Sequence, residues 1–311
     1  MGSEMTFRRP LIIRPPSEWK SYFLPLTNGC SNNTCTFCGY FGSKLQIRES
    51  EEIRKEIDAL AALMSYGLDV PGVQISPLNQ WDGKRVFLQD GDALAYPFPK
   101  LKEVLEYLNK KLPNLERIAA YATPQDILRR DVDELAILKE LKLGILYTGL
   151  ESGSDEILHK VGKGLNSDQV IEATRKAKET GILMSITVIL GLGGIKGSEK
   201  HVEDTARILS EIDPEYAGAL TLTLVPGTPL HREWEEDNFH LISPFQSLEE
   251  LKGIIERANF TNCFFSSMHA SNYQAIRARL PQEKEGIIQE LDHILANRDQ
   301  SSLRPEYLRG L

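Results

Sequence analysis

Three of the four cysteines in this 311-residue chain lie within nine residues, at Cys30, Cys35 and Cys38. Three thiolates on one short loop supply the soft ligands that zinc and iron–sulfur clusters prefer. The remaining cysteine is the distant Cys263, and the histidine nearest to the loop in sequence is His159. A closed structural zinc site needs four ligands, whereas an iron–sulfur cluster held by three cysteines leaves one iron open. The spacing therefore favours a reactive cluster over structural zinc.

Two other interpretations of this loop stay open. A distant side chain could complete a zinc knuckle, or the thiols could be reduced and free of metal. A disulfide framework is not indicated, because three of the four cysteines are clustered at a spacing typical of metal ligands. We therefore expect a protein of the reducing cytoplasm.

Charge and hydropathy limit the partners. The formal net charge is −8, from 36 basic and 44 acidic residues, which argues against a broad footprint on nucleic acid. No run of apolar residues approaches the 18 or so that a membrane span requires. We expect no membrane partner and no nucleic-acid partner.

Short apolar strands alternate with amphipathic helices along most of the chain, which predicts βα units and a parallel sheet. Strands are expected at residues 22–26, 85–89, 117–121, 144–150, 183–190, 219–225 and 263–268. Helices are expected after Ser50 with Met64 on the apolar face, through Leu101 and Leu108, from Asp168 to Gly181, and over residues 282–296. Residues 66–84 show no regular pattern.

Six or seven such units predict an α/β protein with a partial (β/α)6 TIM-like barrel and an additional C-terminal strand and helix. We expect an N-terminal extension over residues 1–20 and a core barrel over residues 21–230. Residues 231–311 are expected to form a C-terminal extension that closes the barrel and contributes to the substrate pocket.

Polar residues follow the predicted strands, where barrel enzymes place their active sites. These residues are Cys30, Cys35, Cys38, Asp90, Asp92, Thr123, Gln125, Glu151, His269, Ser271, Asn272 and Tyr273, and the glycine-rich stretch Gly191 to Gly194 follows the fifth strand. His269 and Tyr273 follow the last strand and are candidate catalytic residues, although structural roles are equally open. Arg277 and Arg279 are candidate anchors for a substrate anion, or merely solvated.

Two further residues receive structural interpretations. Cys263 begins the last strand and is expected to be a buried core thiol. His201 is expected to open a helix. The glycine-rich stretch before it, residues 191–198, has Lys-Gly-Ser rather than Gly-Lys-Ser, so we do not expect a P-loop.

With these motifs in order, the chain resembles the radical S-adenosylmethionine (radical SAM) superfamily over roughly residues 20–230. The chain looks like the subgroup with an oxygen-independent coproporphyrinogen oxidase or Elongator-like core. The resemblance implies an oxygen-sensitive [4Fe–4S] cluster on Cys30, Cys35 and Cys38, with SAM chelating the open iron. The commonest family spacing is CxxxCxxC, and here four residues occupy the first gap.

The resemblance also implies residues that bind SAM. Asp90, Gly91 and Asp92 are similar to the family's Gly-Gly-Glu motif, with Asp92 accepting a hydrogen bond from the methionine amino group. Glu151 corresponds to a glutamate that binds the ribose hydroxyls, and Lys160 and Lys163 resemble the Lys-Gly stretch that follows it.

The resemblance implies two positions that contact the adenine of SAM. Phe37 corresponds to an aromatic residue that packs near adenine, and Ile189 to an isoleucine that contacts it. Ile189 and Gly191 match the pattern GxIxGxxE, whereas Thr187 and Gly194 replace its first Gly and its Glu.

The implied activity is reductive cleavage of SAM to a 5′-deoxyadenosyl radical, which abstracts hydrogen from a small-molecule substrate. An electron donor such as flavodoxin or ferredoxin is implied as a partner. Two alternatives remain: a cluster- or haem-binding chaperone without substrate turnover, and an RNA-modifying radical SAM enzyme. Sulfur insertion is less favoured, because Cys263 alone is left to ligate the second cluster that such enzymes carry.

Overall fold

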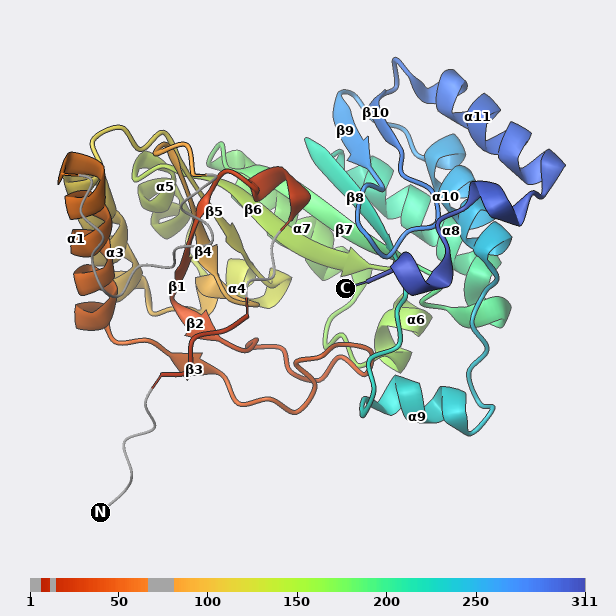
Figure 1. The fold of residues 1–311 in the computed structure, drawn as a ribbon, viewed down its shortest axis with the longest axis horizontal. Coiled ribbons are helices and arrows are strands. Elements are labelled where there is room, and N and C mark those ends of the chain that lie inside the picture. Colours follow the sequence, from red (N-terminus) through yellow and green to blue (C-terminus); the bar gives the residue numbers. More distant parts are fainter. Residues whose placement is uncertain (1–6, 12–14, 67–80, 311) are drawn as a thin grey trace. The chain divides into compact units, whose positions relative to one another are not determined.

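The computed structural model describes residues 7–11, 15–66 and 81–310 (Figure 1). These residues form two compact units. The first contains the described residues up to Asn33 together with Gly42–Tyr147 and Lys176–Ile182. The second contains Thr34–Phe41, Thr148–Arg175 and the described residues from Leu183 onward. Most of the irregular stretch at 66–84 lies outside the described residues, and the expected domain division near residue 230 stays a prediction.

The first unit is built on parallel strands in the order β1, β4, β5 and β6. Their bounds are Tyr22–Pro25, Arg85–Gln89, Arg117–Tyr121 and Leu143–Glu151, and β6 continues into the second unit from Thr148. The helices are α1 (Ser50–Tyr66), α3 (Phe98–Lys111), α4 (Pro124–Arg129) and α5 (Val132–Glu140), with short turns η1 (Pro16–Glu18) and η2 (Ala93–Ala95). The short strands β2 (Thr27–Asn28) and β3 (Gln46–Ile47) pair with each other.

One face of these strands carries an aromatic layer, because side chains of alternate residues share a face. Phe87 lies edge-on to Tyr121 and Tyr147, with ring centroids 5.0 and 5.8 Å apart. The hydroxyl of Tyr147 donates to the buried carboxylate of Glu18 at 2.7 Å. Arg117 pairs with the same carboxylate at 2.5 Å.

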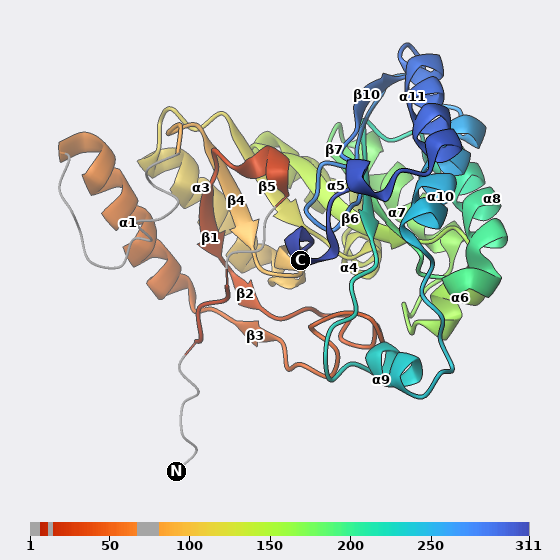
Figure 2. The ribbon, with the colours of Figure 1, turned by 45° about the vertical axis from the view of Figure 1, so that its right-hand side comes forward.

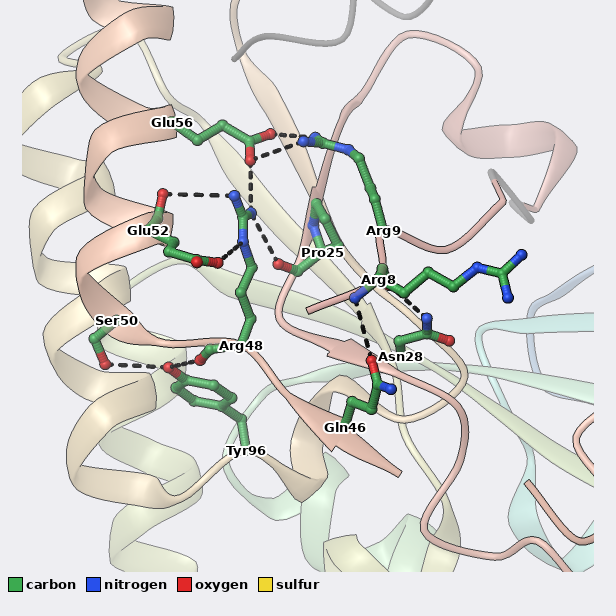
Figure 3. A network of polar contacts seen from close by, with 10 residues as sticks. All are labelled: Arg8, Arg9, Pro25, Asn28, Gln46, Arg48, Ser50, Glu52, Glu56 and Tyr96. Atoms are coloured by element: carbon green, nitrogen blue, oxygen red, sulfur yellow. Dashed lines mark hydrogen bonds and ion pairs between the residues drawn. The ribbon is translucent and has the colours of Figure 1, made fainter. Parts of the chain in front are cut away.

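A buried ion-pair network closes the base of the segment that bears the cysteines (Figure 3). The Glu56 carboxylate on α1 accepts hydrogen bonds from Arg48 Nη1 at 2.6 Å and from the Tyr22 hydroxyl at 2.5 Å. Arg9 also pairs with it. The amide of Arg48 donates to the Leu26 carbonyl at 2.9 Å, so the chain that leaves the sheet after β1 returns to the same point. The side chain of Glu56 is 1% exposed, and the two arginines neutralise a charge that would otherwise be costly to bury.

The second unit continues the sheet from the end of β6 through β7, β8 and β9, with β10 antiparallel at the edge. These strands span Leu183–Leu190, Tyr216–Thr221, Cys263–Ser266 and Arg277–Leu280. The helices are α6 (Asp155–Lys160), α7 (Ser167–Glu179), α8 (Gly194–Ile212), α9 (Pro229–Glu235), α10 (Pro244–Arg257) and α11 (Lys284–Asn297), followed by η3 (Gln300–Ser302) and η4 (Glu306–Leu308). Figures 1 and 2 both show α10 beside α8.

The predicted α/β class with a mainly parallel sheet is confirmed, and β4, β5 and β7 have the predicted bounds. Cys263 is fully buried at the start of β9, as predicted, and burial raises its thiol pKa to about 12. Among the described residues, no helix is both long enough and apolar enough to span a bilayer.

Several local predictions were wrong. The sixth strand ends at Thr221 rather than residue 225, because side chains of the C-terminal segment bind the backbone there: Ser271 Oγ accepts from the Thr221 amide. His201 lies in the middle of α8, fully buried, and does not open that helix. Met64 is 49% exposed, since the buried stripe of α1 ends at Leu60. Strand β10 was not predicted.

We expect Glu56→Gln to lower the free energy of unfolding by about 3 kcal/mol, because Arg48 would be left in a largely buried site without its counter-charge. Chemical denaturation of the variant would measure the loss. Glu51→Gln on the same helix is the matched control, since Glu51 pairs with Lys55 in solvent and its loss should leave stability unchanged. Equal stability of both variants would show that the network does not hold the loop base.

Candidate functional site

The start of the cysteine loop is fixed in the first unit by the residue that follows β4. Asp90 Oδ2 accepts a hydrogen bond from the Gly29 amide at 3.0 Å. The Asp90 amide in turn donates to Thr27 Oγ1 at 3.2 Å. Gly29 has a φ of 97°, a conformation that favours glycine. The backbone entering Cys30 is therefore held by the end of β4.

Two further carboxyl groups, those of Asp92 and Asp126, lie beside Ser31. The Ser31 hydroxyl is 2.5 Å from Oδ2 of both Asp92 and Asp126, and the Thr123 hydroxyl is 3.0 and 2.9 Å from the same two atoms. Thr123 also caps α4 by accepting from the Asp126 amide at 3.2 Å. Residues that follow β4 and β5 thus contact Ser31, the residue after Cys30, through two hydroxyl and two carboxyl groups.

Both carboxyl groups are buried, and Asp92 more deeply than Asp126. Burial, the hydrogen bond to Asp126 and the charge of Asp126 raise the pKa of Asp92 well above its usual range. Asp92 Oδ1 is buried without a hydrogen-bond partner among the described residues. A buried acceptor of this kind is stabilised by any donor that reaches it, and most by a cationic one.

The middle of the loop belongs to the second unit and docks on the end of α6. The Thr36 amide donates to the Val161 carbonyl at 2.8 Å, and Thr34 Oγ1 donates to the Gly162 carbonyl at 2.7 Å. Gly162 has a φ of 67°, and a Cβ there would lie 2.5 Å from the Thr34 carbonyl oxygen. The Leu230 amide, at the start of α9, donates to the Thr36 carbonyl at 3.0 Å. Only glycine fits at position 162 while the loop keeps this path.

Cys35 and Cys38 sit on one turn, closed by a hydrogen bond of 3.1 Å from the Cys38 amide to the Cys35 carbonyl. Neither forms a disulfide, and the side chain of Cys35 is nearly buried. Burial raises the pKa of the Cys35 thiol to about 11, the Lys163 ammonium lowers it, and the nearby Glu151 and Cys38 raise it further. A cation bound at this turn would stabilise the thiolate that burial disfavours.

Glu151 ends β6 with a φ of 64°, a left-handed conformation that is uncommon for any residue except glycine. Its carboxylate accepts from Lys163 Nζ at 2.8 Å, and both side chains are mostly buried. A Cβ at Gly149 would collide with this carboxylate, so the glycine makes room for it. Sequence analysis named Lys163 without a role, and the structure shows it holding Glu151.

Three partly buried apolar side chains, Phe37, Ile189 and Leu224, gather on a buried cluster in the second unit. The cluster consists of Ile157, Val161, Leu192, Leu222, Leu230 and Phe239. Thr187 shares the inner face of β7 with Ile189 and pairs in register with Gly218. The structure therefore brings Phe37 and Ile189 onto one apolar surface, as their implied shared ligand requires.

His269 and Tyr273 both take part in holding the C-terminal segment. The Tyr273 hydroxyl donates to Glu306 at 2.8 Å and accepts from Arg309, whose guanidinium lies 4.2 Å above the ring. His269 Nδ1 is 2.9 Å from Ser271 Oγ, and its carbonyl accepts from Arg304 at 3.1 Å. A catalytic role for either stays a prediction. Arg277 and Arg279 are exposed on the edge strand β10.

Sequence analysis missed Asp126 and Glu250. Asp126 stands three residues after a threonine at a helix start, a pattern that indicates helix capping rather than ligand binding. Glu250 Oε2, on α10, accepts from the Gly191 amide at 2.7 Å, fifty-nine residues away in sequence. No local pattern could have revealed that contact.

The donor set of the loop fits an iron–sulfur cluster. None of the three cysteines is in a disulfide, and hydrogen bonds hold the loop at Gly29, Thr34 and Thr36. In the described parts of the chain, no three His, Cys, Asp or Glu side chains are arranged to hold a single metal ion. The fit therefore rests on the thiols and on the anchoring of the loop, since sites of this kind commonly form when the metal binds.

Known proteins are similar to this chain in sequence. Residues 24–209 match the family model of the radical SAM superfamily. The chain is 26% identical over 214 residues to the heme chaperone HemW of Bacillus subtilis, covering 64% of this chain and 55% of that protein. It is also 26% identical over 207 residues to a tRNA-2-methylthio-N(6)-dimethylallyladenosine synthase of Treponema denticola, covering 65% and 43%. The chain spans about half the length of the curated relatives it matches.

Solved structures show the same fold. Coproporphyrinogen III oxidase (HemN) from Escherichia coli aligns with a TM-score of 0.54 at 18% identity, covering 76% of this chain and 51% of that chain. Elp3 from Methanocaldococcus infernus aligns with a TM-score of 0.52 at 14% identity, covering 71% and 56%. These neighbours have the partial TIM-barrel fold that the sequence predicted. Since the family model covers more than half of its residues, this chain belongs to the radical SAM superfamily, whose members use a [4Fe–4S] cluster and SAM.

Proposed function

We propose that this chain holds one [4Fe–4S] cluster on Cys30, Cys35 and Cys38 and cleaves SAM reductively to attack a small-molecule substrate. The observation that carries the proposal is the anchored loop. It presents three cysteines that are in no disulfide, and strand-end residues hold it before Cys30 while α6 and α9 hold it at Thr36. When bound and reduced, the cluster supplies the electron that splits SAM into methionine and a 5′-deoxyadenosyl radical, which takes hydrogen from substrate.

Residues of this chain would bind SAM by their chemistry. Asp92 Oδ1 is buried and has no hydrogen-bond partner within the described part of the chain, so it would accept a hydrogen bond from the methionine ammonium group. Glu151 would accept hydrogen bonds from the ribose hydroxyls, oriented by its pairing with Lys163. Phe37 and Ile189 would provide the apolar surface for adenine. Thr187 and Gly191 lie on or directly after the same strand and would flank the base.

Two relatives suggest other outcomes. HemW is a heme chaperone, and similarity to it supports a chaperone without substrate turnover as the second candidate. The methylthiotransferase likeness gains less support, because Cys263 is buried in β9 and the chain holds only four cysteines. The net charge of −8 also disfavours a tRNA substrate.

The central test is anaerobic reconstitution with iron and sulfide, followed by SAM and dithionite, with assay of 5′-deoxyadenosine and methionine. We expect Cys35→Ala to lose both the cluster and SAM cleavage, because the loop has no replacement ligand. Cys263→Ala, which removes the remaining thiol, should retain both. A full iron complement in Cys35→Ala would contradict the ligand assignment, and a stable cluster without cleavage in the wild type would favour the chaperone.

We expect Gly162→Ala to reduce cluster content, because its methyl group would displace the Thr34 carbonyl and the turn that follows. Iron and sulfide analysis after reconstitution measures this. Gly42→Ala is a matched control: its φ is 66°, close to that of Gly162, but no atom lies within 4 Å of the added methyl group. If both variants lose iron equally, backbone strain rather than loop docking is responsible.

We expect Asp92→Asn to bind the cluster normally but to weaken SAM binding about 10-fold or more, since a charge-assisted hydrogen bond to the ammonium group is lost. Anaerobic equilibrium dialysis with labelled SAM gives the affinity. Asp90→Ala should show the opposite pattern, with reduced iron, because Asp90 holds the Gly29 amide. Unchanged SAM affinity in Asp92→Asn would remove Asp92 from the site.

A further inference from the structure

The pattern GxIxGxxE ends in a glutamate, and this chain has Gly194 at that position. The structure shows why a larger side chain does not fit there. Gly194 has a φ of 62°. A Cβ there would lie 2.9 Å from the His240 carbonyl oxygen and 3.0 Å from the Phe239 ring. A glutamate at this position would therefore require the neighbouring segment to move.

A carboxylate reaches this strand end from another helix instead. Glu250 on α10 accepts from the Gly191 amide at 2.7 Å and from Ser198 Oγ at 2.6 Å. The side chain of Glu250 is 1% exposed. No lysine or arginine of the described residues is recorded within ion-pair distance of it, so the two hydrogen bonds are its main compensation for burial.

The polar contacts continue from Glu250 through α8 to the end of β6. His201 Nδ1 lies 2.9 Å from Ser152 Oγ, whereas His201 Nε2 has no hydrogen-bond partner among the described residues and lies 3.8 Å from Glu250 Oε2, in contact but beyond hydrogen-bond distance. Thr205, one turn further along α8, accepts from the Gly153 amide at 2.9 Å. Ser152, His201 and Thr205 are all fully buried.

This buried chain connects two segments that the proposed function assigns to one ligand. One end is Gly191, two residues beyond Ile189, and the other is Ser152 and Gly153, directly after Glu151. Hydrogen bonds fix Gly191 to Glu250 at one end and Ser152 and Gly153 to α8 at the other, because an unmade hydrogen bond in the interior is costly; between these ends Glu250 packs against His201. Fixing both segments sets the spacing between the adenine surface and the ribose carboxylate.

We propose that Glu250 is a positioning residue for the nucleoside half of SAM, acting through Gly191 on one side and through His201 on the segment after Glu151. The inference rests on the proposed function. Glu250 does not touch SAM; it orders the two strand ends that do.

The protonation of Glu250 makes the positioning effect depend on pH, which a purely structural role would not do. Burial raises the pKa of Glu250 to about 7, against the opposing hydrogen bonds from Ser198 and Gly191. Burial lowers the pKa of His201 to about 4, although Asp204 opposes this, so the histidine is neutral and gives Glu250 no counter-charge. Since the folded pKa lies above the unfolded value, the buried carboxyl group costs stability as pH rises from about 4.5 through 7.

The test compares Glu250→Gln with Glu249→Gln, an exposed neighbour on the same helix that pairs with Arg298. At pH 8 we expect Glu250→Gln to keep its iron and to unfold at the same or a higher temperature, because no charge is buried. Its affinity for SAM should nevertheless fall about 10-fold, as expected for losing a hydrogen bond to a charged acceptor. At pH 6, where wild-type Glu250 is protonated, the SAM affinities of the wild type and of Glu250→Gln should converge. Glu249→Gln should match the wild type throughout.

A second readout uses the protein without cluster or SAM. Hydrogen–deuterium exchange should be faster in Glu250→Gln at both the 151–154 and 190–194 segments, and Ser198→Ala should show a smaller effect in the same direction. Wild-type SAM affinity in Glu250→Gln at pH 8, or faster exchange at the Gly191 end alone, would overturn the positioning role and leave the proposed function intact. Failure of the wild type itself to bind SAM would instead overturn the proposed function and this inference with it.

Discussion

Closure of one loop is the constraint on which the rest of the structure depends. The Arg48 amide binds the Leu26 carbonyl, so the segment between them leaves and rejoins the first unit at one point. The buried pairing of Arg48 with Glu56 fixes that point to α1. All three clustered cysteines lie inside the closed segment. A loop with fixed ends loses less entropy when it wraps a cofactor than a free one would.

Buried carboxyl groups recur around the sheet, and each is held by different means. Glu56 is neutralised by arginines, Glu151 by Lys163, Asp92 shares hydrogen bonds with Asp126, and Glu250 relies on neutral donors. The last two have no direct cationic partner recorded in the described chain. Groups of this kind reduce stability, and they persist where they order a site or await a ligand.

Much of the fold could be predicted because it depends on local pattern. Strands β4, β5 and β7 are mainly apolar and mostly buried, as strands covered on both faces should be. The cysteine spacing and the acidic residue after β6 are likewise visible in the sequence. The sixth strand was misplaced because its apolar run continues to Val225, whereas its pairing stops where Ser271 and Arg309 bind its backbone.

The roles of Asp126, Glu250 and His201 could not be predicted from the sequence for a different reason. Asp126 resembles a capping residue, and only the fold brings it to Ser31. Glu250 and His201 meet across two helices, so no spacing rule applies to them. Long-range polar contacts of this kind depend on helix packing, which sequence periodicity does not specify.

The central claim is a cluster with three protein ligands and one iron open to SAM. Mössbauer spectroscopy of protein reconstituted with ⁵⁷Fe, before and after SAM is added, tests this most directly. The account predicts a [4Fe–4S] spectrum in which one iron of four changes its parameters when SAM binds. Four irons that are unaffected by SAM, or a protein that takes up zinc and no cluster, would contradict it.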